Sequence, residues 1–362
     1  MTGSEMRPSP RGTPFSAAQW LILTRRAWLA AALAAVAAAL NNSAAAAQVG
    51  AAADPTVPGA ADRGTLQMTQ DPLALLDSVA LLCEFPVREN GETTWPQGVS
   101  INEGAQEIYV SNQNGTELRI DVRTLPAGVR KSSRIVTTED LCWTEALPWF
   151  YNERGQLCFI IRATGGARAN SSTYAVYNYT TGIKGANIPI NGIWRADVSG
   201  KYMATTDAGT TSVSSFYVYD WASVQAGDPA LIATIPAQAG ARTAGKNQGL
   251  AWVGNYFYLI QGSQSESPTF QAWDSNGKLS ISSKYTRADF MDLVNKLKPG
   301  YLTNANYTYE AEGAFNHEGK LVSVQIVNNN PSVATDGQVL VLQHYRTDGV
   351  RGRMQPADPA GQ

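Results

Sequence analysis

The chain of 362 residues has few of the side chains on which metal centres and nucleophilic enzymes most often depend. It has three cysteines, Cys83, Cys142 and Cys158, and two histidines, His317 and His344. No C-x-x-C pair occurs, so a zinc site made of Cys and His is not expected. In an oxidising compartment the three cysteines would allow one disulfide and one free thiol, but their spacing does not indicate which two would pair.

Charge is also scarce, at 16% of residues, with a formal net charge of −2. No block rich in Lys and Arg interleaves with aromatic residues, so nucleic acid is not expected as a partner. The G-x-S-x-G turn, the P-loop and the dinucleotide fingerprint do not occur in the sequence. His317 falls in an expected hairpin turn and His344 in an alternating apolar run, so both are interpreted as structural rather than catalytic.

The N-terminal residues match the parts of an export leader. Arg25-Arg26-Ala27-Trp28-Leu29 opens an alanine-rich apolar run that ends at Leu40, and small residues follow up to Ala47. This order is typical of a twin-arginine leader, which exports folded proteins. A transmembrane anchor is the alternative, but the run is short for the ~20 residues that span a bilayer. We therefore expect a leader over 1–47, a linker over 48–72, and a periplasmic or secreted mature protein without an anchor.

Residues that favour strands and turns are abundant, with 32 Gly, 15 Tyr and 9 Trp. A repeated pattern consists of a polar residue, a glycine, an apolar strand, a turn and further strands. Four copies begin at Gln97-Gly98, Asn191-Gly192, Gln248-Gly249 and Glu312-Gly313, and a fifth, without the glycine, begins at Pro148. These copies follow one another at intervals of roughly 50 residues.

A repeat of this length predicts an all-β fold, a five-bladed β-propeller over residues 73–346, followed by a flexible tail over 347–362. Within the repeats apolar residues alternate, as at Ile108 and Val110, and turns such as Asn276-Gly277 separate the strands. A β-sandwich would not repeat at such long, regular intervals, and a β-helix repeats at shorter ones.

One segment has helical periodicity. Phe290, Leu293, Val294 and Leu297 recur at helical spacing within residues 286–298, and Pro-Gly follows. This predicts one short inserted helix that lengthens the last connection between blades. We expect it to lie across one face of the propeller and to serve in packing rather than as a lid.

The polar residues before the glycines form the main candidate site. In a propeller the innermost strands line a central channel, and a glycine at the start of such a strand lets backbones approach closely. Side chains facing this channel could hold water, a cation or sugar hydroxyls, or could satisfy one another. Calcium held through oxygen ligands of Glu312, Asn191 and Gln97 is one alternative, and no other cofactor is expected. The predicted channel ring is Gln97, Asn191, Gln248 and Glu312, with Glu310 nearby.

Tryptophans near the starts of the blades form a second candidate site. Aromatic faces stack on sugar rings, although propellers also use Trp to pack one blade against the next. The tryptophans proposed to contact a ligand are Trp95, Trp149, Trp194 and Trp252.

At these residues the chain resembles a known family. Trp95-Pro96-Gln97-Gly98 in the first blade, and Tyr309-Glu310-Ala311-Glu312-Gly313 with Asn316 and Gly319-Lys320-Leu321 in the last, resemble one particular five-bladed propeller. Phage receptor-binding tail proteins share it with teichoic-acid biosynthesis protein C-like proteins. The resemblance covers roughly residues 84–345, and it implies a cell-surface recognition module for carbohydrate polymers of the bacterial envelope. The expected leader, and the lack of a virion-attachment or trimerisation segment, favour an exported binder encoded by a bacterium.

The sequence therefore predicts an exported, non-catalytic propeller that recognises a bacterial envelope polysaccharide, in an oligomeric state that the sequence does not indicate. Two alternatives stay open. One is a hydrolase or lyase that uses axial carboxylates, Glu310 with Glu312 or Asp197 with Glu312, with or without calcium. The other is a protein-interaction scaffold in the periplasm.

Overall fold

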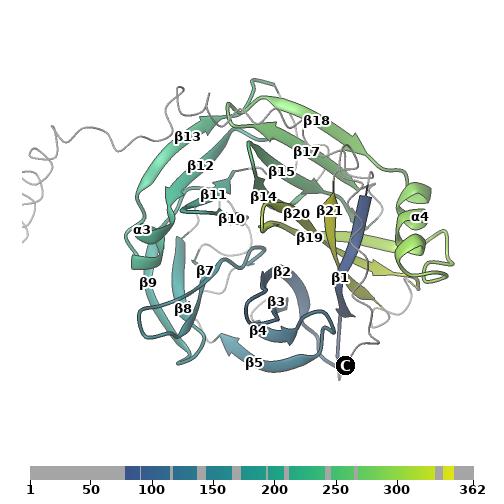
Figure 1. Cartoon of the computed structure of the whole chain (residues 1–362), viewed down its shortest axis with the longest axis horizontal. Helices are drawn as coiled ribbons and strands as arrows, with labels where there is room; N and C mark the ends of the chain where they lie inside the picture. The colour runs from purple at the N-terminus through teal and green to yellow at the C-terminus, as the bar shows by residue number, and fades with distance from the viewer. Residues whose placement is uncertain are drawn as a thin grey trace, which may run out of the picture. The chain divides into compact units, whose positions relative to one another are not determined.

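Five antiparallel sheets surround a common axis in a computed structural model of the chain (Figure 1). The described residues are 78–89, 91–114, 117–136, 144–164, 173–192, 195–207, 212–240, 246–264, 268–330 and 337–345. All of them belong to the second of the two units into which the chain divides. The fold is a five-bladed β-propeller, as the repeats predicted. The expected leader, linker and tail lie outside the described residues.

Four blades are built from consecutive stretches of the chain, with the first strand of each nearest the axis. Blade 1 contains β2 (Trp95–Asn102), β3 (Glu107–Asn114), β4 (Glu117–Thr124) and β5 (Arg130–Val136). Blade 2 contains β6 (Trp149–Tyr151), β7 (Leu157–Thr164), β8 (Thr173–Asn178) and β9 (Ile183–Pro189). Blade 3 contains β10 (Ala196–Ser199), β11 (Tyr202–Thr206), β12 (Ser215–Asp220) and β13 (Leu231–Pro236). Blade 4 contains β14 (Asn247–Val253), β15 (Tyr256–Gln261), β17 (Thr269–Asp274) and β18 (Leu279–Lys284).

Blade 5 combines strands from both ends of the described chain. Its inner strand is β19 (Thr308–His317), which is followed by β20 (Lys320–Asn328) and β21 (Gln338–Tyr345). The N-terminal strand β1 (Ser78–Pro86) pairs with β21 as the outermost strand and closes the ring. The short β16 (Ser263–Gln264) pairs with β19 on the opposite side. This closure by β1 was not predicted, because pairing between chain ends leaves no periodic signal.

The burial pattern explains why the strands differ in composition. Inner strands such as β2 are buried on both sides, whereas outer strands such as β18 alternate between exposed and half-buried residues. The buried apolar side chains form five clusters, each between two neighbouring blades. The core therefore consists of interfaces between sheets.

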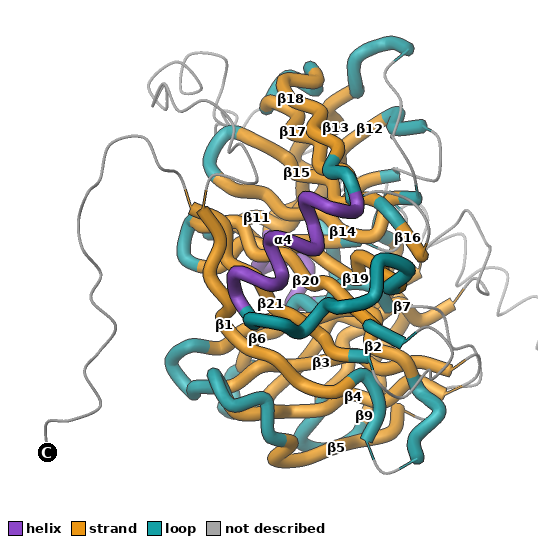
Figure 2. The backbone as a smooth tube through the Cα atoms, turned by 90° about the vertical axis from the view of Figure 1, so that its right-hand side faces the viewer, coloured by secondary structure: helices purple, strands orange, loops and turns teal. Residues whose placement is uncertain are grey.

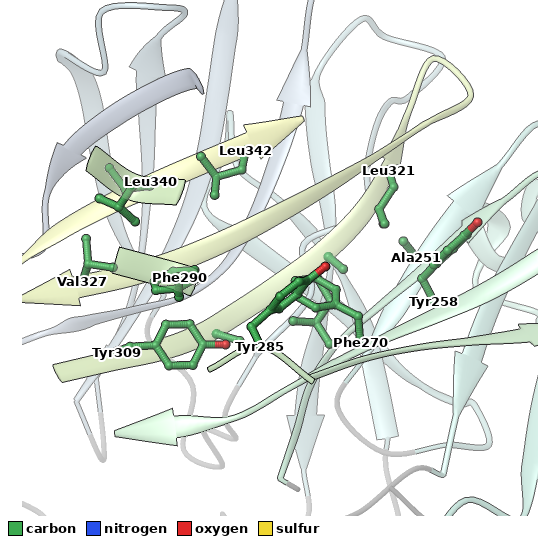
Figure 3. Close-up of a cluster of buried hydrophobic side chains, with 14 of the residues drawn as sticks. Ala251, Tyr258, Phe270, Tyr285, Phe290, Tyr309, Leu321, Val327, Leu340 and Leu342 are labelled. Carbon is green, nitrogen blue, oxygen red and sulfur yellow. The ribbon is translucent and has the colours of Figure 1, made fainter. Parts of the chain in front are cut away.

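The predicted inserted helix is α4 (Arg287–Leu297). Thr286 and Asp289 form a capping box at its start, which satisfies backbone N–H groups of the first turn. Phe290 and Val294 are buried in the cluster between blades 4 and 5, where the Phe290 ring lies 4.8 Å from that of Tyr309 (Figure 3). It is thus a packing helix, but it lies at the outer rim rather than across a face as expected (Figures 1 and 2).

A second helix, α3 (Trp221–Ala226), links β12 to β13 and was not predicted. Asp220 caps its start by accepting a hydrogen bond from Ser223 N, and Gly227 ends it in the left-handed conformation. Asp220 and Gly227 are thus the sequence signals from which this helix could have been predicted. No helix among the described residues is long and apolar enough to cross a membrane.

The described cysteines are free thiols. Cys83 and Cys158 are both buried, in different core clusters, so they do not pair with each other. Burial raises the pKa of the Cys83 thiol to about 11. Cys142 lies outside the described residues.

Candidate functional site

Five buried polar residues, one associated with each blade, lie within the inner strands or shortly before them. Each comes directly before a glycine or an alanine in the sequence. We call this set the axial cluster: Gln97, Glu145, Arg195, Gln248 and Glu312.

Three members occupy the same kind of backbone irregularity. The pairing of the first two strands shifts register between Pro96 and Gly98, between Asn247 and Gly249, and between Ala311 and Gly313. Gln97, Gln248 and Glu312 are therefore the extra residues of three equivalent β-bulges. A bulge re-aims a side chain that would otherwise follow the pleat of the strand.

Close approach of neighbouring blades explains two of the glycines. A Cβ at Gly98 would lie 3.0 Å from the backbone of Glu145 and Ala146 in the next blade. A Cβ at Gly249 would lie 2.4 Å from the backbone nitrogen of Ala314. The prediction that these glycines let inner strands converge is confirmed.

Hydrogen bonds and ion pairs connect the axial cluster across blades. Arg195 pairs with Glu145 on one side and donates to Gln248 Oε1 at 3.0 Å on the other. Gln248 Nε2 in turn donates to Glu310 Oε1 at 3.0 Å, and Lys246 Nζ lies 3.6 Å from the same oxygen.

At the junction of blades 5 and 1, the Trp95 indole N–H donates to Glu312 Oε1 at 3.0 Å. Most of the cluster is thus held by its own members and by three flanking residues, Trp95, Lys246 and Glu310. This arrangement matches one of the two roles expected for such a ring, mutual satisfaction.

The charges of the cluster are held at an electrostatic cost. Burial raises the pKa of Glu312 well above its usual range, and the neighbouring carboxylates Glu310 and Glu145 raise it further. Burial also raises the pKa of Glu145, against the opposing charge of Arg195. The same loss of solvent lowers the pKa of Arg195. Perturbed pKa values of this kind cluster at functional sites, and structural ion-pair networks produce them too.

A cavity of about 220 Å³ lies beside the cluster, between the inner strands of blades 1, 2, 3 and 5. Glu145 of the axial cluster is part of its wall. From there the lining follows the inner strands to Ile101, Trp149 and Asn316, which come at or just before the hairpin turns. The wall is mixed, with apolar Val99, Leu147 and Phe315 and polar Ser100, Asp197 and Asn316.

Asp197 is a second buried acid in this wall. Its Oδ2 accepts hydrogen bonds from the backbone N–H of Trp252 at 2.7 Å and of Asn316 at 2.9 Å. Burial raises the pKa of Asp197 to about 7, although these two N–H groups act in the opposite direction. The carboxyl can therefore gain or lose a proton near neutrality.

The structure places the predicted ring residues unequally. Gln97, Gln248 and Glu312 belong to the axial cluster, and Glu310 contacts it. Asn191 instead is exposed in the segment between β9 and β10, where its backbone N–H donates to the Tyr219 hydroxyl at 2.6 Å. The sequence pattern missed Glu145 and Arg195, because it required a glycine where blades 2 and 3 have alanine.

The predicted aromatic residues do not share one end of the channel. Trp95 begins β2 and contacts Glu312, whereas Trp149 donates to Ile101 O at 3.0 Å near the opposite end of that strand. Trp252 stacks on Tyr202 with 6.0 Å between ring centroids, and its backbone oxygen accepts a hydrogen bond from Asn316. Trp149 is the one of these three that lines the cavity. Trp194 lies outside the described residues.

The residues predicted to hold calcium have other partners or positions. Glu312 accepts from Trp95, and the Gln97 amide nitrogen donates to Pro96 O at 3.0 Å. Asn191 is exposed in the segment between β9 and β10. Calcium at this ring stays a prediction.

No protein-family model and no curated protein sequence matches the chain. Solved structures similar to it include BamB from Moraxella catarrhalis, at 11% identity and TM-score 0.28, with 69% of this chain and 58% of that chain covered. The chain thus spans less than two thirds of the length of BamB. An exo-beta-1,3-galactanase from Phanerochaete chrysosporium is similar at 8% identity and TM-score 0.41, covering 73% and 63%. A GH43 endo-arabinanase from Bacillus licheniformis is similar at 12% identity and TM-score 0.39, covering 69% and 93%.

Proposed function

We propose that this propeller binds one terminal unit of a bacterial envelope carbohydrate in the channel cavity, without cleaving it. The observation that carries the proposal is the cavity of about 220 Å³ that is lined by the inner strands and their flanking residues. Its volume is below the ~300–1,000 Å³ of sites for drug-sized ligands, so it suits a single sugar ring better than a stretch of polymer.

The chemistry of the wall supports a polyhydroxy ligand. Trp149 and Phe315 offer apolar surface for sugar C–H groups, while Ser100, Asp197 and Asn316 offer hydrogen-bond partners for hydroxyls. The resemblance to phage receptor-binding and teichoic-acid biosynthesis protein C-like propellers supports the same class of ligand. The envelope polysaccharide would then be recognised at its end.

A filled cavity tests this proposal. Ser100→Leu would place an apolar side chain in the wall, and Ser280→Leu makes the same change at an exposed position of β18. Binding of envelope polysaccharides and their component sugars would be measured by calorimetry, together with polymer length. We expect S100L to weaken binding at least tenfold, about 1.4 kcal/mol or more, while S280L binds as the parent does.

Retained binding in S100L would place the ligand outside the channel. Absence of binding to any saccharide in the parent chain would contradict the proposal and favour the protein-interaction scaffold.

A specific observation also favours a second candidate, carboxylate-based hydrolysis or elimination. Asp197 and Glu145 both line the cavity, and burial raises the pKa of each. One protonated and one ionised carboxyl group are what glycoside cleavage requires. Polymer shortening that disappears in Asp197→Asn would establish this function in place of simple recognition. Among the axial acids, Glu145 rather than Glu312 would be the second carboxyl, because Glu312 is not part of the cavity wall.

A further inference from the structure

Two hairpin turns bring one histidine and two glutamates together at the end of the channel away from the axial cluster. Glu103 follows β2 in blade 1, while His317 ends β19 and Glu318 follows it in blade 5. One ligating atom from each lies within 4.8 Å of the others. We propose that Glu103, His317 and Glu318 bind a divalent transition-metal ion of the zinc type.

The spacing suits an ion better than a direct contact. His317 Nε2 lies 3.7 Å from Glu103 Oε2, which is too long for a hydrogen bond. Two ligands of a tetrahedral zinc ion, each ~2.0–2.2 Å from the metal, are roughly 3.4 Å apart. A small closing movement of exposed glutamate side chains would complete such a site.

Both turns are fixed by asparagines one residue before the ligands. Asn102 accepts from Ala105 N at 3.1 Å, and its amide donates to the Tyr109 and Tyr151 hydroxyls. Asn316 accepts from Gly319 N at 2.8 Å, and its amide donates to Trp252 O at 2.7 Å. The backbones that carry the ligands are therefore held in place before any ion binds.

The donor set indicates the class of metal. One imidazole and two carboxylates give three protein ligands and leave a position for water or an exogenous ligand, as in open zinc sites. Calcium and magnesium prefer oxygen donors alone, so the imidazole favours zinc and its neighbours in the first transition series.

The three proposed ligands are close in sequence to residues that line the cavity. Ile101 and Asn316 line the cavity, and the ligands follow one or two residues later. A hydroxyl or carboxylate of a ligand in the channel could occupy the open metal position. The metal site itself does not depend on carbohydrate recognition.

The chain has only two histidines, which makes the test direct. Zinc binding to the full chain would be measured by calorimetry, and the Cε1–H resonance of each of the two imidazoles would be followed by NMR during the titration. We expect one ion per chain and a shift of the His317 resonance, while that of His344, buried in β21, stays in place. His317→Gln and Glu318→Gln should each weaken binding at least about tenfold.

Glu153→Gln is the matched control, because it removes an exposed carboxylate from the corresponding inner hairpin of blade 2. It should bind zinc as the parent does, and circular dichroism would verify that all variants fold. Unchanged affinity in H317Q, a shift of the His344 resonance instead, or no binding up to about 1 mM zinc would each overturn the proposal.

Discussion

Two regions of this propeller bury several charges, and they do so in opposite ways. On blade 1, the carboxylate of Asp121 is fully buried among three arginines, with N–O distances of 3.0 Å to Arg119, 3.1 Å to Arg123 and 3.2 Å to Arg130. Glu89 and Glu92 complete the set at its solvent edge, so three positive charges meet three negative ones. We call these six residues the blade 1 network.

The protonation equilibria of the two regions differ in direction. Burial alone would raise the pKa of Glu92, but hydrogen bonds and charges from Arg130 and Arg119 outweigh it and lower the pKa. The hydrogen bond to Glu92 likewise raises the pKa of Arg130. In the axial cluster, burial outweighs pairing and moves the pKa values of Glu145, Glu312 and Arg195 toward their neutral forms.

The two regions therefore represent two different ways of burying charge. Glu89 and Glu92 lie in the segment between β1 and β2, so the blade 1 network ties the closing strand of blade 5 to blade 1. The axial cluster links inner strands at a cost in desolvation, which apolar side chains would avoid. The ligand binding that we propose for the adjacent cavity would give a reason for retaining these charges.

The largest effect is expected from Asp121→Asn. The substitution keeps the shape but leaves the three arginine side chains paired, among the described residues, with two partly exposed glutamates. Breaking a buried charge network in this way should cost roughly 3–5 kcal/mol of unfolding free energy. Urea unfolding would measure it, with the exposed Glu153→Gln as the control. A loss below about 1 kcal/mol would mean that the blade 1 network does not hold the ring together.

Asp197 should produce the next largest effect, through pH. Its folded-state pKa of about 7 is above the ~3.9 of an unfolded aspartate, so the folded protein holds this proton more tightly. The resulting stabilisation is complete below about pH 4 and is lost as the pH rises through about 7. We expect Asp197→Asn to remove this pH dependence of the unfolding free energy, which amounts to on the order of 4 kcal/mol between the two pH limits.

Unfolding free energies at a series of pH values would check the effect of Asp197, with Asp228→Asn at an exposed position as the control. An unchanged slope in D197N would show that another group titrates in this range.

Glu312→Gln should change stability far less than Asp121→Asn, although both residues are buried acids. The amide oxygen can still accept the hydrogen bond from Trp95, so below about pH 4 we expect a change within about 1 kcal/mol. Because burial and the nearby Glu310 and Glu145 raise the pKa of Glu312, the parent should lose stability relative to the variant as the pH rises. Denaturant unfolding followed by tryptophan fluorescence would measure the unfolding free energies of parent and variant below about pH 4 and at neutral pH. A cost of several kcal/mol at neutral pH would instead show that Glu312 is ionised and needed as an anion.

Much of the fold was readable from sequence because each blade carries its own pattern. The polar-residue–glycine signal located the inner strands of blades 1, 4 and 5, and helical spacing located α4 almost to the residue. The pairing of β1 with β21 joins segments at opposite ends of the propeller, and local periodicity carries no information on such a contact.

The candidate site could be predicted only in part, because the sequence pattern covered only those positions that precede a glycine. Gln97, Gln248 and Glu312 sit in bulges where a glycine follows, so the pattern found them. Glu145 and Arg195 precede alanines and lie just outside strands β6 and β10, so strand-based alignment of the repeats passed over them. Allowing alanine in place of glycine would have selected Glu145-Ala146 and Arg195-Ala196.

The smallest effect, but the sharpest contrast, is expected from Glu92→Gln. Glu92 is partly exposed, so its pairs with Arg119 and Arg130 should contribute about 1 kcal/mol at most, and less in high salt. Since its pKa is lowered in the folded state, this contribution is present above the unfolded glutamate pKa of ~4.3 and is lost as the pH falls through the folded value. Asp197 and Glu312 act in the opposite direction, so the blade 1 network should weaken in acid and the axial region in base. Unfolding free energies of E92Q and E312Q, each compared with the parent over the same pH series, would test this opposition. If the two differences changed in the same direction with pH, the distinction between the two regions would be lost.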